Sequence, residues 1–538
     1  MRRSMNIEEG KRLIDNGELS VGIEFGSTRI KTVAIDVQCR TLATGAYEWE
    51  NDYKNGYWTY SMNETWVGLQ QSYLAMTEDL KAQYHTQLTH IASLGISGMM
   101  HGYLVFDDKD DLLIPFRTWR NNNANQAAQI LREDFDVNIP ERWSIAHLYQ
   151  AAIDQEPHVK NVQYMTTLSG YVHWYLTDEQ VIGVGDASGM FPIDHTTQSY
   201  RKDLLDRFNQ LFKARGYTQQ IEDILPKVVT AGEQAGTLTA TGAKLIDPQG
   251  YLKPGCPLCA PEGDAATGMT STNSVAPRTG NVSAGTSIFA MIVLEEPIQA
   301  LYPEVDSVMT PDGYEVAMIH ANNCTSDINA WMQLFEDVLQ TFGVDYDKET
   351  LFTKLFQQAL KGDDDLGKLL SYGYVSGEFI TDVPQGYPMF IRQVDSKLTL
   401  ANFMKTLIYS AFATLKIGID LLKENEHIQI DTMLGHGGIF KTEKVAQSFL
   451  AAALESQVSV MQTASEGGAW GIAALARYIF ESDRYTLSSY LKEVAFEDTE
   501  AITITPTDDD IASFRDYTQR FQSGLELEKQ AATLFDRK

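Results

Sequence analysis

The sequence predicts an α/β protein built from two similar domains, and three observations support this prediction. The chain has 538 residues, which is too long for one ordinary hydrophobic core. Apolar residues make up 43% and charged residues 21%, which is ordinary for a globular protein that can bury sizeable cores. A strand, a turn of small residues and a second strand begin each half, as EFGSTRIKTVAID and SAGTSIFAMIVL. No repeat of roughly 20–50 residues recurs, so we interpret the pattern as a duplicated domain and not as a solenoid.

The first pair of strands is predicted from Leu19–Asp36. Apolar and polar residues alternate on both sides of Gly26-Ser27-Thr28, which is typical of two strands joined by a tight turn. This pattern differs from the strand-to-helix start of a P-loop, whose motif is absent from the sequence. The same periodicities predict strands at Thr41–Tyr47, His90–Ser97 and Tyr103–Asp107, helices at Glu64–Gln83, Asn121–Phe135 and Tyr164–Leu176, and a loop at Asp186–Gly189.

The second half contains the strand Thr286–Leu294 and a long helix at Thr399–Asn425, whose apolar residues follow a helical period. The tail from Thr505 to Lys538 is predicted as one amphipathic helix with Thr507 as its N-cap. Between these segments the pattern predicts strands at His427–Met433 and Val458–Gln462 and helices at Lys441–Glu455 and Gly467–Phe480.

The charge balance limits the classes of partner. Lys and Arg number 43 against 72 Asp and Glu, so the formal net charge is −29. This argues against general binding to nucleic acid or to anionic membranes. The first residues lack the apolar segment of a signal peptide, and no stretch approaches the ~18 apolar residues of a membrane span. We therefore expect a cytoplasmic protein without a nucleic-acid or membrane partner.

The four cysteines do not form a recognisable metal or redox motif. Cys256 and Cys259 are a lone CxxC pair, whereas a zinc site needs two further ligands at matching spacing. A thioredoxin-like context is also missing. We expect two reduced thiols on a buried strand.

The stretch Ala260–Ala290 carries the clearest chemical signal. Asp264 stands in a turn flanked by glycine, and a carboxylate there can accept a proton from an attacking hydroxyl. The small-residue loop Ser283–Ser287 would let backbone N–H groups approach an anion closely. Together they suggest phosphoryl transfer to an alcohol. The alternatives are that Asp264 caps a helix beginning near Ala265, which is compatible with a role as base, and that the loops are ordinary β-turns.

Six short motifs resemble those of the FGGY carbohydrate kinases, and they follow one another in the expected order over about Ser20 to Phe480. They are Glu24–Lys31, Gly95–Gly102, Asp186–Gly189, Gly263–Ala266, Gly285–Ser287 and Gly435–Gly438, the last followed by Glu466–Ala469. No single motif is specific, but the ordered set is.

The resemblance implies two actin-like domains of the ribonuclease H type around a central cleft, with ATP and Mg2+ as cofactors. We expect sugar to promote closure of this cleft. The domain ranges that we expect are an N-terminal extension at 1–18, a sugar-binding domain at 19–275, an ATP-binding domain at 276–482 and a short helical appendage at 483–538.

The resemblance also implies roles for individual residues. Asp264 is expected to be the catalytic base and to take part in sugar and Mg2+ binding. The other sugar-binding candidates are Met100, His101, Trp119 and Ala265. The candidates for ATP and its phosphates are Gly26, Ser27, Thr28, Lys31, Gly285, Thr286, Ser287, Gly437 and Gly438. Glu24 is the second metal candidate, and a solvated strand-end acid is the alternative interpretation for it.

Three positions depart from the family pattern. Glu24 stands where the family has Asp, Met99 stands where Gln is common, and Trp119–Asn123 lacks a carboxylate expected there. The sugar-side motif is most similar to that of xylulokinases, so the resemblance implies phosphorylation of a ketopentose, D-xylulose first, to a 5-phosphate. A ribulokinase or another FGGY sugar or polyol kinase is the alternative. An actin-like ATPase and a weakly catalytic sugar-binding regulator complete the hypotheses, and a homodimer is one assembly to be considered.

Overall fold

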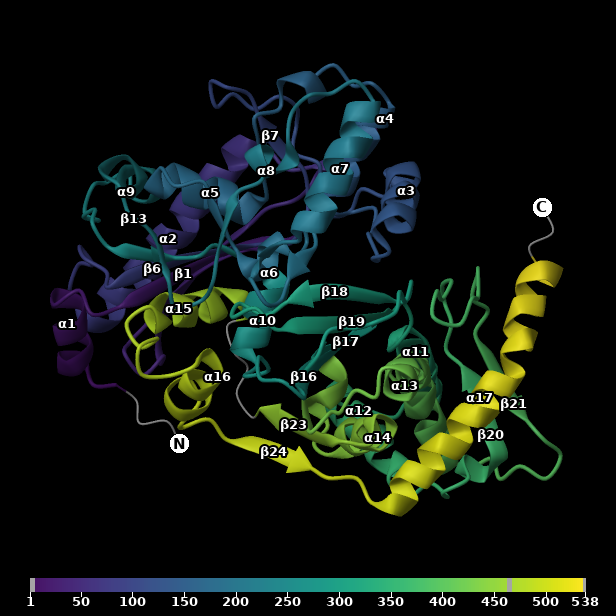
Figure 1. The fold of residues 1–538 in the computed structure, drawn as a ribbon. Helices are drawn as coiled ribbons and strands as arrows, with labels where there is room; N and C mark the ends of the chain where they lie inside the picture. The colour runs from purple at the N-terminus through teal and green to yellow at the C-terminus, as the bar shows by residue number, and fades with distance from the viewer. Residues whose placement is uncertain (1–4, 462–466, 536–538) are drawn as a thin grey trace. The chain divides into compact units, whose positions relative to one another are not determined.

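The computed structural model describes residues 5–461 and 467–535 (Figure 1). Two compact units can be distinguished by their internal contacts. Unit 1 comprises Met1–Ala276, Ser307–Val316 and Ala464–Asp498. Unit 2 comprises Pro277–Asp306, Ala317–Thr463 and Thr499–Lys538. These units group residues by packing, whereas the predicted domain ranges follow chain order and stay a prediction.

Unit 1 is built on a mixed seven-stranded sheet with the order β13-β14-β6-β1-β2-β3, and β15 pairs with β6. β1 and β2 are antiparallel, which confirms the predicted strand–turn–strand at Leu19–Asp36. β1 and β6 are parallel, so their carboxyl ends lie at the same edge. The bounds are β1 (Ser20–Phe25), β2 (Arg29–Ile35), β3 (Thr41–Glu48), β6 (Ser93–Gly98), β13 (Gln234–Thr237), β14 (Pro257–Cys259) and β15 (Glu262–Gly263).

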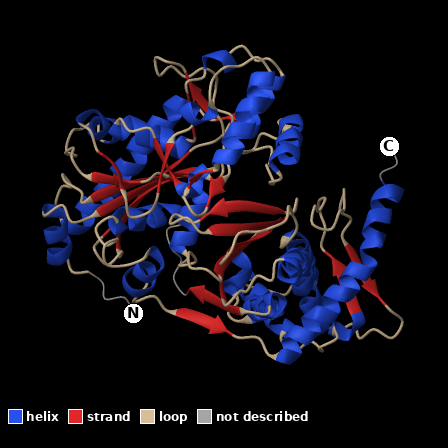
Figure 2. Cartoon of the chain, in the orientation of Figure 1, coloured by secondary structure: helices blue, strands red, loops and turns tan. Residues whose placement is uncertain are grey.

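Helices cover both faces of this sheet (Figure 2). α15 (Gly468–Tyr478) packs so closely on β1 that a side chain at Gly22 would collide with the Ala469 carbonyl oxygen. A side chain at Gly45 of β3 would collide with the Ser72 carbonyl of α2 (Met62–Tyr84). The pairing register places Gly22 and Gly45 on opposite faces, because neighbouring residues of a strand alternate. The packing of α15 on β1 places Ala464–Asp498 in unit 1.

A second apolar core of unit 1 lies among helices outside this sheet. Trp143, Tyr149, Phe191 and Phe208 are buried together there. The surrounding elements are β7 (Leu104–Phe106), α3 (Asn125–Phe135), α4 (Ser144–Ile153), β8 (Tyr164–Thr166), α6 (Val184–Ala187), β10 (Ile193–Asp194), β11 (Ser199–Tyr200), α7 (Lys202–Ala214) and α8 (Ile221–Ile224). Unit 1 also contains α1 (Ile7–Asp15), β4 (Asp52–Lys54), β5 (Tyr57–Thr59), α5 (Leu168–Thr177), β9 (Val181–Gly183), β12 (Lys227–Val229), α9 (Ala240–Ile246), α10 (Asp264–Ser271) and α16 (Leu487–Tyr490).

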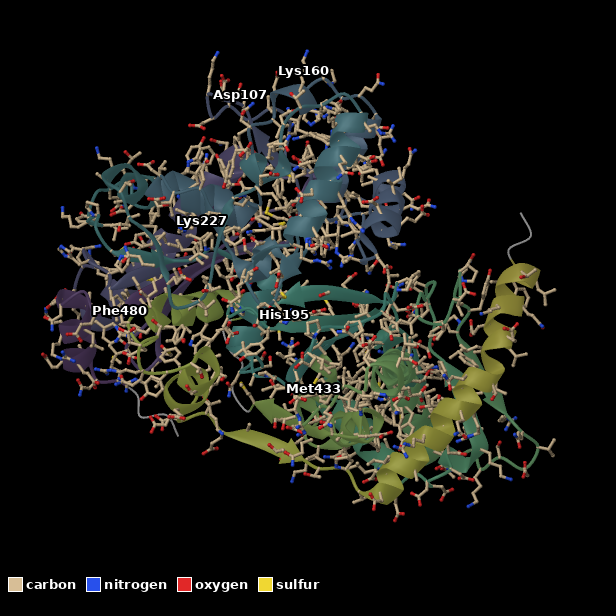
Figure 3. The ribbon with its side chains drawn as sticks, in the orientation of Figure 1. Asp107, Lys160, His195, Lys227, Met433 and Phe480 are labelled. Atoms are coloured by element: carbon tan, nitrogen blue, oxygen red, sulfur yellow. The ribbon has the colours of Figure 1, made fainter. Side chains whose placement is uncertain are left out.

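The second seven-stranded sheet has the order β18-β19-β17-β16-β22-β23-β24 and lies mainly in unit 2. Its core includes Met433 of β22, which Figure 3 labels. The strands are β16 (Thr279–Ala284), β17 (Ile288–Val293), β18 (Val305–Met309), β19 (Glu315–Ala321), β22 (Thr432–His436), β23 (Gln457–Met461) and β24 (Ala501–Ile504). The other elements are α11 (Ser326–Thr341), α12 (Lys348–Ala359), β20 (Leu369–Tyr372), β21 (Met389–Arg392), α13 (Leu400–Asn425), α14 (Val445–Leu454) and α17 (Asp508–Phe535).

Hydrogen bonds cap two long helices of unit 2, and one of these caps was predicted. The Thr399 hydroxyl accepts a hydrogen bond from Asn402 N–H at the start of α13. The Thr507 hydroxyl accepts one from Asp510 N–H at 3.2 Å, which confirms Thr507 as the N-cap of α17. Such caps satisfy N–H groups that the first helical turn leaves without partners.

Four predictions of local structure were wrong in part. The segment Tyr164–Leu176 begins with β8, and α5 starts only after the Thr167 cap. The predicted loop at Asp186–Gly189 begins inside the short helix α6, because a buried carboxylate satisfies its first N–H groups. The predicted strand His427–Met433 starts later, at Thr432. The appendage contains the strand β24, whose β-branched residues pair with β23.

The cysteines are buried thiols without disulfide partners, as predicted, but of the CxxC pair only Cys259 lies on a strand. Cys39, Cys256, Cys259 and Cys324 are buried and free, and Cys259 ends β14. Burial raises the pKa of the Cys256 thiol to about 12, so the group stays protonated and unreactive. Among the described helices, none is both long and apolar enough to cross a bilayer.

Candidate active site

Asp264 is the first residue of α10 and follows β15 directly. Its Oδ1 accepts a hydrogen bond from Met100 N–H at 3.1 Å. Gly263 occupies the N-cap position, so the alternative in which Asp264 itself caps the helix does not hold. The side chain is open to solvent on one side. Desolvation by the surrounding protein raises its pKa, while N–H donors of Met100 and Ala265 lower it. An accessible carboxylate with a raised pKa is suited to accepting a proton.

His101 follows the end of β6 in the left-handed region, at φ 66°. Its Nδ1 lies 3.1 Å from the Gly189 carbonyl oxygen, which can only accept, so Nδ1 carries the proton. The ring stacks beside Trp143 at 6.4 Å. Burial, followed by the charge of Arg142, lowers the pKa of His101 to about 3. The imidazole is therefore neutral, and its Nε2 is an acceptor.

Met100 links His101 to the segment Gly263-Asp264. Its side chain is only 5% exposed, and a Cβ at Gly263 would collide with its Cγ. Gly189 is equally constrained, because an added Cβ would lie 2.6 Å from His101 Nδ1. The structure thus brings Met100, His101 and Asp264 together. Ala265 follows Asp264 in the first turn of α10 and is half-buried.

The run Trp119–Asn123 is organised by Asn121. The buried Asn121 amide accepts a hydrogen bond from Trp58 N–H at 2.8 Å and donates one to the Trp58 carbonyl at 2.9 Å. Arg120 stacks on the Trp58 ring at 4.1 Å. Trp119 itself is 38% exposed. The Asn121 side chain, which lies in the run that departs from the family pattern, therefore holds the loop in place. The role of Trp119 as a sugar wall stays a prediction.

Glu24 lies at the carboxyl end of β1, opposite Lys31 of β2 and beside Ser97 of β6. Its Oε2 accepts a hydrogen bond from Ala469 N–H at 3.2 Å, at the start of α15. Desolvation and the charge of Asp264 raise the pKa of Glu24 to about 7, while Ala469 N–H and Lys31 lower it. The half-buried carboxylate is thus held by a helix N-terminus, which favours negative charge, and is not a simply solvated acid.

The chemistry of these two carboxylates fits Mg2+. The described residues contain no group of three or more His, Cys, Asp or Glu side chains arranged for a metal. Mg2+ does not need such a group, because it keeps several waters and uses one or two carboxylates with substrate phosphates. The Asp264 charge raises the Glu24 pKa, and a divalent cation near both would offset this repulsion. Glu24 and Asp264 would hold the ion.

The turn Gly26–Thr28 has all three of its carbonyl groups occupied. Trp49 donates from its indole to the Gly26 carbonyl at 2.7 Å and from its backbone to that of Thr28 at 3.2 Å. Tyr60 donates to the Ser27 carbonyl at 2.6 Å. The Gly26 N–H donates to the Arg29 carbonyl at 3.0 Å, so the groups of the turn suited to an anion are its hydroxyls and its remaining N–H groups.

The turn Gly285–Ser287 in unit 2 repeats this arrangement. Thr325 donates from both its backbone and its hydroxyl to the Gly285 carbonyl, at 3.1 and 2.8 Å. Cys324 N–H donates to the Thr286 carbonyl at 3.0 Å. Gly285 and Thr286 are exposed. In both turns, Gly26–Thr28 and Gly285–Ser287, donors from other segments bind the backbone carbonyl groups.

Gly437 and Gly438 follow the end of β22, which runs parallel to β16 and places His436 beside Ser283. Gly437 has a φ of 119°, and a side chain there would collide with the Ala284 carbonyl. Only glycine fits this position. Gly438 has open space around it. Both are exposed beside the Gly285 turn, whereas Glu466 lies outside the described residues.

Sequence reasoning assigned no role to Glu262 and named Asp186 only as part of the motif Asp186–Gly189. Burial, together with the charge of Asp264, raises the pKa of Asp186 to about 7. Burial, together with the charge of Asp186, raises the pKa of Glu262 to about 8. Glu262 stands only two residues before Asp264, but its partners are distant in sequence. Arg142, whose charge lowers the pKa of His101, was also missed, because no local pattern distinguishes it.

Comparison with known proteins gives a consistent result. The model of the FGGY family of carbohydrate kinases matches in two parts, its N-terminal domain at residues 19–269 and its C-terminal domain at 280–479. The xylulose kinase of Haemophilus influenzae is 21% identical over 416 residues, which span 75% of this chain and 80% of that protein. The xylulose kinase of Klebsiella pneumoniae is 21% identical over 237 residues, which span 41% of this chain and 47% of that protein.

Solved structures share the fold. The xylulose kinase of Brucella ovis superposes with a TM-score of 0.74 at 18% identity, covering 95% of this chain and 99% of its own. A gluconate kinase of Lactobacillus acidophilus gives 0.75 at 15% identity, covering 96% and 99%. The glycerol kinase of Plasmodium falciparum gives 0.73 at 14% identity, covering 95% and 98%. The shared fold is the two-domain, actin-like architecture of sugar kinases. The three solved structures are named for three different substrates, xylulose, gluconate and glycerol.

Proposed function

Because this chain belongs to the FGGY family of carbohydrate kinases, which use ATP as phosphate donor, we propose that its acceptor is the primary hydroxyl of a ketopentose. D-xylulose is the first candidate and would give D-xylulose 5-phosphate and ADP. The similarity to xylulose kinases supports this choice, as does the Met100-His101 pair at the end of β6.

The tautomer of His101 is the observation that carries the proposal. With its Nδ1 proton donated to Gly189, the ring offers only an acceptor at Nε2. A sugar hydroxyl can donate to this nitrogen, whereas the carboxylate of an aldonate cannot. The nearby Asp264 carboxylate adds to the selection against an anionic acceptor. A neutral ketose fits this site better than gluconate does.

In the proposed reaction Asp264 takes the proton of the primary hydroxyl as its oxygen attacks the γ-phosphorus of ATP. A bond forms between that oxygen and phosphorus, the bond from phosphorus to the bridging oxygen breaks, and ADP leaves. The Met100 N–H bond orients the carboxylate. The raised pKa of Asp264 brings its proton affinity closer to that needed by a general base near neutral pH.

The nucleotide is proposed to bind through the glycine-containing turns. Gly26, Ser27, Thr28 and Lys31 are the candidates in unit 1, and Gly285, Thr286, Ser287, Gly437 and Gly438 are those in unit 2. The hydroxyl groups of Ser27, Thr28, Thr286 and Ser287 suit phosphate oxygens, and the exposed Gly437–Gly438 segment suits the flat face of adenosine. Mg2+ bound near Glu24 and Asp264 would neutralise charge on the phosphates during transfer.

A coupled assay of ADP release across ketoses, alditols and aldonates tests the proposal. We expect D-xylulose to give the highest kcat/KM, with gluconate and glycerol much poorer. Preference for gluconate would overturn the argument from His101. ATP turnover that does not depend on sugar would favour an actin-like ATPase, and tight sugar binding without turnover would favour a regulator.

A further inference from the structure

The Glu262 carboxylate joins β15, which directly precedes Asp264, to the start of α6. Glu262 is 1% exposed on β15, where it pairs with Ser97 of β6. Its Oε1 accepts a hydrogen bond from Gly185 N–H at 3.3 Å, and its Oε2 accepts one from Asp186 N–H at 2.9 Å. These N–H groups lie in the first turn of α6, which has no other side-chain cap. A carboxylate from another strand therefore holds the beginning of this helix.

Glycines leave room for this contact. A Cβ at Gly183 would collide with the Glu262 carboxyl group, and one at Gly185 would lie 2.6 Å from Oε2. Gly183 N–H also donates to the Pro261 carbonyl at 2.8 Å. The segments at 183–185 and 261–262 therefore pack closely around the buried Glu262 side chain. Packing this close leaves the side chain little freedom to move.

The other end of the same segment holds His101. The Gly189 carbonyl accepts the Nδ1 proton of His101 at 3.1 Å. Between the two ends, Ser188 donates from its hydroxyl to the Gly185 carbonyl at 2.6 Å. Asp186 accepts hydroxyl protons from Thr167 at 2.7 Å and Ser169 at 2.5 Å. Residues 185–189 therefore form a rigid bridge with Glu262 at one end and His101 at the other.

The second oxygen of Asp186 supports this picture. Asp186 Oδ1 is fully buried and has no hydrogen-bond partner in the described structure. It faces Gly263, where an added Cβ would lie 3.3 Å away. An unpaired buried oxygen carries a desolvation cost that other interactions of the segment must offset. The other contacts of residues 185–189 therefore hold this segment beside Gly263-Asp264 despite the desolvation of Asp186 Oδ1.

We propose that Glu262 is a positioning residue that sets the separation and orientation of Asp264 and His101. The base lies two residues after Glu262, and the sugar-binding imidazole is held through Gly189, so one carboxylate fixes both. Glu262 itself touches neither sugar nor ATP. The role of this bridge in turnover rests on the proposed function of Asp264 and His101.

Replacement of Glu262 tests this role. In Glu262→Gln the amide retains one acceptor but turns an NH2 group toward a backbone N–H, so one end of the bridge loosens. We expect kcat per folded molecule to fall about 10²-fold, since a misplacement near 1 Å has an effect of this size. KM for sugar should rise, and KM for ATP should stay unchanged. Glu262→Ala should lose more than Glu262→Gln.

Ser93→Ala is the matched control. It removes a buried hydroxyl pair with Ser20, at 2.8 Å in the same sheet, without touching the bridge. If Glu262 had only a structural role, Glu262→Gln and Ser93→Ala would both lower thermal stability, and both would leave kcat per folded molecule unchanged. Equal kinetic constants for Glu262→Gln and the wild type would overturn the proposal. Should both Glu262 variants fail to fold, Ser188→Ala removes the hydroxyl that donates to the Gly185 carbonyl within the bridge and accepts from Met309 N–H at 3.0 Å. It should give a smaller loss of the same kind.

A second measurement needs no sugar and is therefore independent of the acceptor's identity. Imidazole nitrogen NMR of histidine-labelled protein, assigned with His101→Gln, reports the tautomer of His101. We expect the Nδ1–H form in the wild type between about pH 5 and 8 and a mixture of tautomers in Glu262→Gln. An unchanged His101 signal in Glu262→Gln would contradict the proposal. Absence of ketose phosphorylation by the wild type would instead contradict the proposed function alone.

Discussion

The backbone N–H of Met100 donates to Oδ1 of Asp264 at 3.1 Å, across 164 residues of sequence. This bond joins the strand end that presents His101 to the helix that presents the proposed base. It also fixes one oxygen of the Asp264 carboxylate, so that the other is available to a substrate hydroxyl. A substitution at Asp264 should therefore be judged by whether it keeps the acceptor for Met100 N–H and by whether it keeps the oxygen that faces the substrate.

Replacing Asp264 by Asn should abolish phosphorylation while leaving nucleotide binding nearly intact. The amide oxygen can still accept the Met100 N–H, but it cannot take a proton from the sugar. We expect kcat to fall about 10²–10⁴-fold, the usual contribution of a general base. Coupled ADP release measures turnover, and calorimetry measures ATP affinity. Substantial activity in Asp264→Asn would show that another group is the base.

Replacing His101 by Ala should lower kcat/KM for the sugar by about 10- to 100-fold, because a sugar hydroxyl would lose its acceptor in a desolvated site. KM for ATP should change little. The control is His195→Ala, a change at an exposed histidine beside β10 that Figure 3 labels. Equal losses in both variants would mean that His101 has no specific role in sugar binding.

Gly437 and Gly438 form a matched pair for the nucleotide site. Gly437→Ala forces a side chain against the Ala284 carbonyl at a φ of 119°, whereas Gly438→Ala enters open space. We expect ATP affinity to fall at least tenfold in the first variant, which corresponds to about 1.4 kcal/mol, and to stay close to wild type in the second. Sugar binding measured by calorimetry should be unaffected in both. The reverse order of effects would contradict the predicted nucleotide loop.

Glu24→Gln should raise the Mg2+ concentration needed for half-maximal activity. The amide can still accept the Ala469 N–H, so α15 keeps its partner while the site loses a negative charge. A shift of about 10-fold is expected, which is typical for a residue that holds Mg2+ through water. Glu48→Gln is the control, since Glu48 is an exposed acid paired with Arg29. An unchanged Mg2+ titration would remove Glu24 from the metal site.

Glu528 should make the stability of the protein depend on pH. Its side chain is fully buried on α17, where Oε2 accepts Tyr387 N–H at 3.1 Å, and burial raises its pKa to about 7. Between its ordinary pKa of 4.5 and about 7, the folded state keeps a proton that the unfolded state releases. The stabilisation is therefore complete below about pH 4.5 and is lost as the pH rises to 7.

Glu528→Gln is neutral at every pH and should gain stability over the wild type across this range, by on the order of 1–3 kcal/mol above pH 7. Urea unfolding at several pH values measures the difference. Glu526→Gln changes an exposed acid on the same helix and should show no such trend. A constant difference between Glu528→Gln and wild type across the range would mean that Glu528 does not titrate as described.

Much of the local structure was predictable because its causes are local. The alternation around Gly26-Ser27-Thr28 predicted β1 and β2, and the helical period after Thr399 predicted α13. The short helix α6 was missed, since its N–H groups are satisfied by Glu262 from another strand. The strand β24 was missed because its four residues become a strand only by pairing with β23.

The sequence by itself determined the elements, the family and the identity of the proposed base, because periodicity, turn residues and ordered motifs are properties of neighbouring residues. Only the tertiary structure decided that Glu24 meets the start of α15, across 445 residues, and that Glu262 holds the segment that positions His101. These contacts arise from strand pairing and close glycine packing between distant segments. Nothing in the local sequence specifies which distant backbone groups a buried carboxylate will satisfy.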